Sequence, residues 1–281
     1  MTSLKNRIVT FLFVVAGLCM INYPFLAEWV NSFHQAEVLS VYDEVLAQSS
    51  EEELAACIED ANQYNQSLLM QNVTLNDAFS SGGSHDETYL SLLSLSPDGV
   101  MGMIEIPKIH VTLPIYHGTS SKVLEEGAGH LEGSSLPVGG IGTHAVLSAH
   151  SGLPEKLLFS DIDQLEIGDH FKILVYGLQM EYEVDDIRVV EPWDTSYLSI
   201  QEDKDVVTLV TCTPYGINSH RLFVSGHRVE WTDTEVTVEN DSAGFHIGIR
   251  EIQISILAIS TVILIVAMKM LLFSRRRNRN E

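Results

Sequence analysis

The cysteine at position 212 has neighbours that could make it a nucleophile. Cys212 ends the apolar run TLVTC, the turn-like segment PYGIN follows, and Arg221 stands nine positions after the cysteine. If the flanking segments pair as antiparallel strands, Arg221 falls nearly opposite Cys212. A guanidinium in that place can lower the pKa of the thiol or donate hydrogen bonds to a developing oxyanion. On these residues alone, a buried structural cysteine beside a surface arginine explains the pattern equally well.

A cysteine nucleophile also needs a proton acceptor, and the sequence has 11 histidines. His150 ends the apolar segment THAVLSAH and precedes the turn SGLP, and side chains at such strand ends often serve a site. His144 stands six residues earlier and would lie on the same face of the strand. The alternation of a strand therefore does not distinguish the two histidines.

A disulfide between Cys57 and Cys212 is the alternative to a free thiol. In the segment SSEEELAACIEDANQY, Ser50 is a helix N-cap with Glu53 three residues later, and apolar residues recur at helical spacing. This pattern places Cys57 on the buried face of a helix, where a disulfide would require Cys212 to pack directly against it. We interpret Cys57 as a small core residue, and Cys19, within an apolar run, as a lipid-facing or packing residue.

The sequence lacks the common motifs for metals and nucleotides. It has no H-E-x-x-H, no paired C-x-x-C, no EF-hand spacing, no G-x-G-x-x-G and no P-loop. We therefore expect neither a metal site nor a cofactor.

From residue 100 onward, short apolar segments alternate with glycine and proline, which is typical of a mainly β domain. We expect seven or more strands, with candidates at residues 101–106, 112–117, 143–150, 170–177, 180–191, 205–213 and 220–231. A helical stretch, SKVLEEGAG, follows the second of them. Strands of this number and length favour a closed barrel or a sandwich. Residues 36–69 have a helical pattern, and the segment from Ser80 to Ser84 is rich in serine and glycine, as flexible loops are.

Both ends of the chain carry apolar runs about long enough to cross a bilayer, at residues 8–26 and 252–273. Basic residues lie outside both runs, at Lys5 and Arg7 and in the segment SRRRNR. The positive-inside rule then places both termini in the cytoplasm and the middle of the chain outside. A cleaved signal peptide is the alternative for the first run, but no A-x-A-like cleavage site is evident, so we favour an uncleaved anchor.

Charge separates the ends from the middle of the chain. Of the 38 acidic residues only Glu281 lies outside the middle, whereas seven of the 16 Lys and Arg residues lie at the ends. A domain with such an excess of negative charge repels nucleic acid, so a nucleic-acid partner is not expected.

The segment TLVTC followed by Arg221 resembles the active-site signature of sortases, the membrane-bound cysteine transpeptidases of Gram-positive bacteria. The longer blocks TLVTCTPYGINSHRL, LPIYHGTS, GAGHLEGSSLPVGG and HAVLSAHSGLP are similar to the pilus-specific class C sortases, and the resemblance extends over residues 36–230. It implies a closed barrel of about eight strands with N-terminal helices, a lid loop and two transmembrane helices.

The resemblance also implies a role for each site residue. Cys212 would be the nucleophile, His150 would transfer the proton, and Arg221 would hold the substrate and stabilise the oxyanion. Thr211 would help to position the substrate backbone. The resemblance thus favours His150 over His144. The implied reaction cleaves an LPXTG-like sorting signal of a pilin subunit between Thr and Gly and joins it, through a thioester, to a lysine amine of another pilin.

Class C sortases typically carry a lid with an Asp-Pro-aromatic motif, and the corresponding residues here are Asp77, Ala78 and Phe79. The resemblance implies that Asp77 pairs with Arg221 and that Phe79 packs over Cys212. We expect the pair to lie at a surface cleft and to contribute about 0–1 kcal/mol. Alanine in place of proline removes some stiffness, so we expect a mobile lid.

These inferences divide the chain into a cytoplasmic tail (1–7), an anchor (8–26), a helical region (27–74), the lid (75–89), the barrel (100–231), a linker (232–251), a second span (252–273) and a basic tail (274–281). A sortase that attaches proteins to the cell wall, a membrane-anchored cysteine protease and a non-enzymatic adhesion barrel are the alternatives. The two enzymes would differ from a pilus sortase in the acceptor, which is a cell-wall amine for the first and water for the second.

Overall fold

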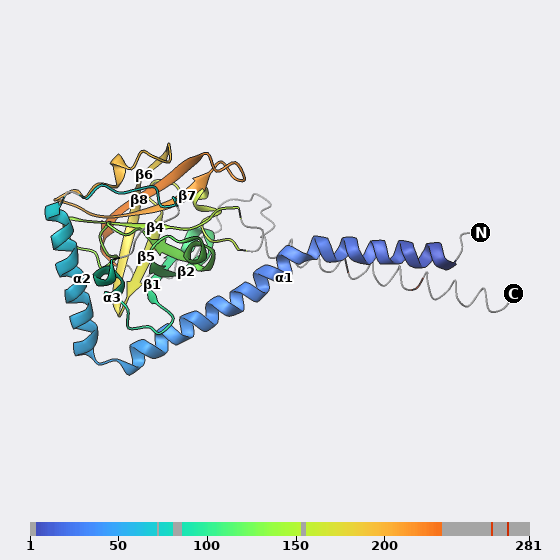
Figure 1. The fold of residues 1–281 in the computed structure, drawn as a ribbon, viewed down its shortest axis with the longest axis horizontal. Coiled ribbons are helices and arrows are strands. Elements are labelled where there is room, and N and C mark those ends of the chain that lie inside the picture. Colours follow the sequence, from blue (N-terminus) through green and yellow to red (C-terminus); the bar gives the residue numbers. More distant parts are fainter. Residues whose placement is uncertain are drawn as a thin grey trace. The chain divides into compact units, whose positions relative to one another are not determined.

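The protein is described from a computed structural model, which describes residues 4–71, 73–80, 86–152 and 156–231, together with residues 260 and 269. The chain forms two compact units, one of Met1–Asn31 with Val238–Glu281 and the other of Ser32–Thr237. The second unit contains every strand found in the described residues (Figure 1).

Four α-helices lie in the described residues: α1 (Leu4–Gln48), α2 (Glu51–Gln71), α3 (Glu87–Ser91) and α4 (Ser121–Glu126). None of the helices in the described part of the chain is both long enough and apolar enough to cross a membrane. In the first unit, Asn22 donates a hydrogen bond of 3.0 Å to Ser260 Oγ. The predicted linker, the predicted second span (apart from residues 260 and 269) and the basic tail lie outside the described residues.

The N-terminus of α2 has the predicted capping box. Ser50 Oγ accepts from the Glu53 backbone N–H at 3.2 Å, and the Glu53 carboxylate accepts from the Ser50 backbone N–H at 2.9 Å. This exchange satisfies backbone donors that the helix leaves unpaired. Cys57 packs partly buried against the core, and it is a free thiol, as are Cys19 and Cys212. No disulfide links Cys57 to Cys212.

Eight strands close into a barrel, so the prediction of a closed mainly β barrel is confirmed. Around the barrel the order is β1-β2-β3-β4-β7-β8-β6-β5. Their bounds are β1 (Val100–Ile106), β2 (Val111–His117), β3 (Ala128–His130), β4 (Thr143–Ser148), β5 (His170–Val175), β6 (Leu178–Val190), β7 (Asp205–Thr213) and β8 (His220–Val229). The prediction missed β3, which has only three residues.

Two apolar clusters lie on opposite faces of the strands that carry the site. Ala145 and Leu147 of β4 point into the barrel core, whereas Val146 points outward. Strand geometry explains this division, because successive side chains alternate between the two faces. The outward-facing set, which we call the outer cluster, comprises Ala78, Leu131, Val146, Val190, Leu198, Val210 and Phe223.

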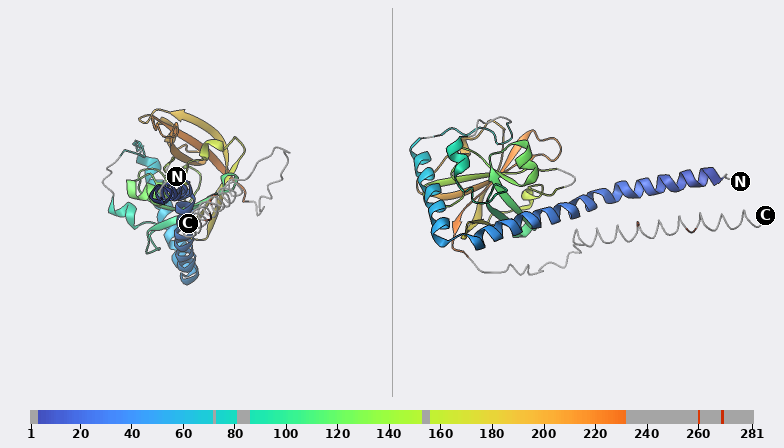
Figure 2. Two further views of the ribbon diagram at one scale, coloured as in Figure 1. Left: turned by 90° about the vertical axis from the view of Figure 1, so that its right-hand side faces the viewer. Right: turned by 60° about the horizontal axis from the view of Figure 1, so that its bottom comes forward.

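Helix α2 lies beside the barrel (Figures 1 and 2), and buried polar contacts hold it there. The Asn65 side-chain amide donates to the Leu136 carbonyl at 3.0 Å, and its carbonyl accepts from the Leu136 N–H at 2.7 Å. At the end of α1, the Tyr42 hydroxyl accepts from the Tyr176 backbone N–H at 2.7 Å, and the two rings stack. These contacts fix the start of the segment that carries residues 73–80.

Candidate active site

The β7–β8 hairpin places Arg221 directly opposite Cys212, as the sequence predicts. The turn between the strands requires left-handed backbone conformations, which Gly216 (φ 74°) and Asn218 (φ 59°) adopt. Glycine and asparagine tolerate this region better than other residues do. The sequence of the turn therefore sets the register that joins the thiol to the guanidinium.

The end of β4 brings His150 to the same level of the sheet. Strands β4 and β7 are parallel, and Ser148 lies opposite Val210. His150 follows Ser148 by two residues, as Cys212 follows Val210. Since these steps of two keep side chains on one face, His150, Cys212 and Arg221 form one row across three strands. We call it the cysteine row.

Hydrogen bonds on both sides of His150 tie it to the strand of Cys212. The Thr211 hydroxyl donates to the Ala149 carbonyl at 2.8 Å, and the Ser151 hydroxyl donates to the Cys212 carbonyl at 2.7 Å. The Thr211 hydroxyl is buried, and its hydrogen bond to Ala149 helps to position the loop that carries His150. The role in positioning substrate that we expected for Thr211 stays a prediction. Sequence reasoning missed Ser151, because nothing in a serine after a strand signals a contact 61 residues away.

The structure separates His144 from His150. His144 is only 1% exposed. Its Nε2 lies 2.7 Å from Thr208 Oγ1, and its Nδ1 lies 3.1 Å from the Ser199 carbonyl oxygen. Thr208 Oγ1 in turn lies 2.7 Å from Ser225 Oγ. We call His144, Thr208 and Ser225 the polar end. Because both ring nitrogens of His144 lie within hydrogen-bond distance of protein atoms, His144 has a structural role.

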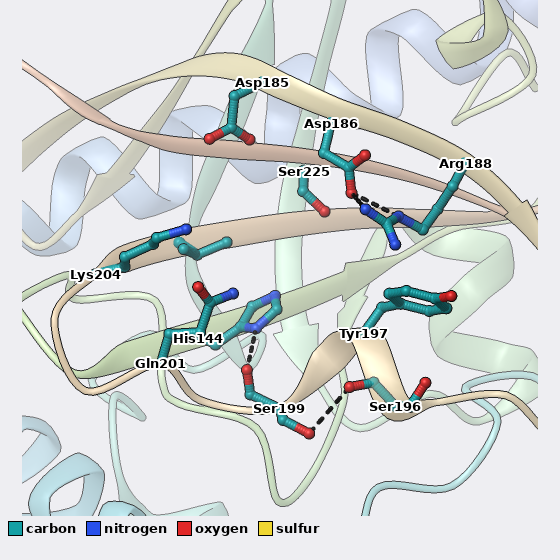
Figure 3. Close-up of a pocket in the computed structure, with 11 residues that line it drawn as sticks. His144, Asp185, Asp186, Arg188, Ser196, Tyr197, Ser199, Gln201, Lys204 and Ser225 are labelled. Carbon is teal, nitrogen blue, oxygen red and sulfur yellow. Dashed lines mark hydrogen bonds and ion pairs between the residues drawn. The ribbon is translucent and has the colours of Figure 1, made fainter.

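A cavity of about 510 Å³ lies over the polar end, away from the thiol. Figure 3 shows Asp185, Asp186 and Arg188 on one side of it and the segment with Ser196 and Tyr197 on the other. Arg188 is already paired with the Asp186 carboxylate. Neither the thiol nor His150 lines this cavity.

The lid holds Arg221 with a bidentate ion pair. Arg221 Nε lies 2.8 Å from Asp77 Oδ1, and Nη2 lies 2.7 Å from Asp77 Oδ2. The Arg221 side chain is 10% exposed and that of Asp77 is 16% exposed, so the pair is mostly buried and not open at a surface cleft as we expected. Removing one partner of a pair this buried leaves a charge uncompensated. Arg221 Nη1 also donates to the Asn218 and His220 carbonyls.

Phe79 covers the cysteine row from the lid. Its ring centroid lies 5.7 Å from that of His150, and Arg221 Cζ lies 5.0 Å from the ring centroid. These are the ring contacts that the structure gives for Phe79, and the expected packing of Phe79 over Cys212 stays a prediction. Ala78 is buried in the outer cluster. The lid thus touches two members of the row.

The stem of the lid is held at a second point. The Thr195 hydroxyl donates to the Leu75 carbonyl at 2.9 Å. A cavity of about 310 Å³ lies between the lid and the segment after β6, lined by Leu75, Asp77, Pro192, Trp193 and Thr195 among others. Residues 81–85 of the predicted lid lie outside the described residues, and the expected mobility of the lid stays a prediction.

The surroundings disfavour the charged forms of both the thiol and the imidazole while the lid is in place. Burial raises the pKa of the Cys212 thiol, and Asp77 adds to this, while Arg221 opposes it. Burial also lowers the pKa of His150, against the effect of Glu125. A thiol with a raised pKa and an imidazole with a lowered one are both neutral near pH 7. The covered site therefore holds an unactivated pair.

Comparisons with known proteins identify the family of the barrel. A sortase domain model matches residues 104–229, which include the cysteine row but not the lid. Sortase D of Bacillus subtilis is 34% identical over 131 residues, which are 46% of this chain and 63% of that protein. The chain thus spans less than two thirds of the length of the curated relatives it matches first.

Solved structures of similar proteins cover more of the chain. Sortase C-1 from Actinomyces oris is 45% identical with a TM-score of 0.61, and the match covers 64% of this chain and 99% of that one. Sortase C1 of GBS pilus island 1 is 38% identical with a TM-score of 0.64, and the match covers 72% of this chain and 95% of that one.

Proposed function

This chain belongs to the sortase family, and we propose that it is a class C sortase that polymerises pilins. It cleaves LPXTG-like sorting signals and joins each pilin subunit to a lysine amine of another. The observation that carries the proposal is the lid, whose Asp77 occupies Arg221 while Phe79 lies over His150. The similarity to sortase C structures, one of them from a pilus island, supports it.

In the first step, the Cys212 sulfur attacks the carbonyl carbon of the substrate threonine. His150 takes the proton of the Cys212 thiol as the carbon–sulfur bond forms, and gives this proton to the departing amine as the carbon–nitrogen bond to glycine breaks. Arg221 donates hydrogen bonds to the oxyanion, which requires Asp77 to have left it. The product of this step is a thioester on Cys212.

In the second step, a lysine amine attacks the thioester carbon. His150 takes a proton from the amine, the carbon–nitrogen bond forms, and the carbon–sulfur bond breaks to return the free cysteine. The result is an isopeptide bond when the amine reaches the thioester before water does. This step needs no group beyond those of the cysteine row.

Lid opening has to precede both steps, because the closed lid takes up the Arg221 cation and covers the His150 ring. Removing Asp77 and Phe79 from the row takes away a negative charge and some of the burial. Both changes lower the pKa of the thiol, while Arg221 keeps its favourable effect. The exchange of lid for substrate thus activates the nucleophile where it is needed.

The two apolar runs at residues 8–26 and 252–273 support a two-pass arrangement in the cell membrane. In this arrangement both termini lie in the cytoplasm and the barrel lies on the outer face, in accord with the flanking basic residues. Pilin substrates tethered to the same membrane would meet the enzyme at a raised effective concentration.

The test is covalent ladder formation by the full chain in detergent micelles, with a pilin subunit that carries an LPXTG-type signal. We expect a ladder of isopeptide-linked pilins that disappears completely in Cys212→Ala. Transfer only to a cell-wall peptide amine would indicate the wall-anchoring alternative, and release of a free acid alone would indicate a protease. A ladder that survives in Cys212→Ala would refute the mechanism.

A further inference from the structure

Ser148 stands one row away from the cysteine row, on the face that the lid covers. Its register partner on β7 is Val210, which is opposite Phe223 of β8. Val146, two residues before Ser148, belongs to the outer cluster together with Ala78 of the lid. Because side chains of a strand alternate, Ser148 points to the same side as Val146, beneath the lid.

The hydroxyl of Ser148 is buried and unpaired. Ser148 is 0% exposed, and its oxygen has no hydrogen-bond partner among the residues that the structure describes. The other side-chain atom of the described residues in this condition is Asn22 Oδ1, which belongs to the other unit of the chain. Buried polar groups nearly always have a hydrogen-bond partner, so a buried hydroxyl without one calls for an explanation. A ligand that supplies the missing acceptor is such an explanation.

The described residues of the lid do not supply that partner, and the polar groups of Asp77 are used elsewhere. The Asp77 carboxylate accepts from Arg221 and, at 3.3 Å, from the Phe79 backbone N–H. The Asp77 carbonyl accepts from the backbone and the hydroxyl of Ser80. Ala78, the lid residue in the outer cluster, has a methyl side chain with no polar atom.

A peptide in the same place differs from the lid in one respect that matters here. Neighbouring rows on one strand face are two residues apart along the strand. An extended peptide rises about 3.3 Å per residue, as a strand does, and has a carbonyl on every residue. With its scissile carbonyl at Cys212, such a peptide brings another backbone carbonyl over the row of Ser148, about two residues away. A carbonyl oxygen is the acceptor that the hydroxyl lacks.

We infer that Ser148 is a positioning residue that donates a hydrogen bond to a backbone carbonyl of the sorting-signal peptide and thereby favours the peptide over the lid. This inference rests on the proposed function. It explains how a lid with a bidentate, mostly buried ion pair gives way to a peptide. The lid leaves a buried donor unpaired when it closes, and the peptide satisfies that donor when it binds.

The experiment compares Ser148→Ala with Ser225→Ala in the full chain. Ser225 lies on the same outward face and has a hydroxyl partner in Thr208 at 2.7 Å, so it is a matched control outside the region under the lid. Two quantities are measured: KM and kcat for a fluorogenic LPXTG-type peptide, and the rate of Cys212 alkylation by iodoacetamide without peptide, followed by peptide mass mapping.

Loss of the donor should raise KM about fivefold in Ser148→Ala with kcat within about a factor of two, since one hydrogen bond is lost. Alkylation should become slower, because the lid then closes over a surface without an unpaired donor. Ser148→Thr, which keeps a hydroxyl, should retain a KM near that of the wild type, and Ser225→Ala should change neither quantity.

An unchanged KM in Ser148→Ala, or an equal rise in Ser225→Ala, would overturn the inference. Alkylation that is no slower in Ser148→Ala would overturn it as well. If the wild-type chain does not cleave the peptide at all, the proposed function fails. The alkylation rates, which need no substrate, then decide whether Ser148 disfavours the closed lid.

Discussion

The two ends of one sheet face use similar residues for opposite purposes. The polar end and the cysteine row lie on the same three strands, and each combines a histidine with hydroxyl or thiol groups. At the polar end, His144 Nε2 and Nδ1 both have fixed protein partners. In the cysteine row, Arg221 is paired with the lid and the ring of His150 packs against Phe79 of the lid. The difference is that the partners of His144 belong to the barrel and stay in place, whereas the partners of Arg221 and His150 belong to the lid and can move away. Only the cysteine row can therefore be freed to react.

The largest expected difference between the two ends is in the effect of removing each histidine. His150→Ala should lower kcat/KM for an LPXTG-type peptide by roughly 10²–10⁴, because a general acid–base is lost. His144→Ala should instead lower the melting temperature, because Thr208 and the Ser199 carbonyl lose a buried partner. Steady-state kinetics and calorimetry on both variants check this. A large rate loss in a well-folded His144→Ala enzyme would break the comparison.

Replacement of Arg221, the cation of the cysteine row, should have the second largest effect. Arg221→Lys keeps a positive charge but loses the planar fork, so we expect kcat to fall about 10²-fold. Melting temperatures serve as the control for folding. A lysine variant with near wild-type kcat would show that charge alone suffices and that Arg221 does not act through paired hydrogen bonds.

Opening the lid should activate the thiol. Asp77→Ala removes both bonds to Arg221, so alkylation of Cys212 near pH 7 should become roughly tenfold faster. Because burial and Asp77 raise the pKa of the thiol in the closed state, their loss lowers it, and the pH profile of alkylation should move to lower pH. Asn76→Ala, at the neighbouring lid position, is the control. An unmoved profile would mean that the lid does not control the ionisation of Cys212.

Hydrogen exchange of the wild-type chain compares the mobility of the lid with that of the barrel strands. Amides of residues 75–80 should exchange faster than those of β4 and β7, because Ala78 lacks the stiffness of the proline typical of such lids. The buried ion pair limits the difference, so we expect intermediate rather than coil-like rates. Protection equal to that of the barrel strands would show that the lid opens only when the barrel unfolds.

The smallest effect concerns acid stability. Burial lowers the pKa of His130 to about 4 and also lowers that of His144, so both stay neutral in the folded barrel. An unfolded histidine binds a proton below about pH 6.5, so the unfolded state gains stability as the pH falls from there through about 4. The melting temperature should fall over this window, and less steeply in His144→Asn. An equal slope in the variant would contradict the role given to His144.

Local patterns predicted much of the barrel, and nonlocal contacts account for the rest. The turn after Cys212 allowed the pairing with Arg221 to be predicted from the sequence, since glycine and asparagine stand where the backbone needs them. Strand β3 was missed, because three residues are too few for a periodic pattern. The predicted helical stretch SKVLEEGAG also included Ala128 and Gly129 of this strand, whereas α4 ends at Glu126.

The candidate site shows the same limit. His144 and His150 share one strand face, so alternation could not distinguish them, and the partners that do so lie more than fifty residues further along the chain. The burial of the Asp77–Arg221 pair likewise depends on how Ala78 and Phe79 pack, which no local pattern shows. Ser148 has no sequence signal at all, since its significance lies in the absence of a partner among the described residues.

The central claim is that Cys212 forms a thioester with a sorting signal. The most direct measurement is intact mass spectrometry of the full chain after brief incubation with an LPXTG-type peptide and without an amine acceptor. We predict a mass increase equal to the peptide fragment that ends in threonine, mapped to Cys212 and reversed by hydroxylamine. An unmodified chain that has nevertheless cleaved the peptide, or an adduct on Cys57, would contradict the account.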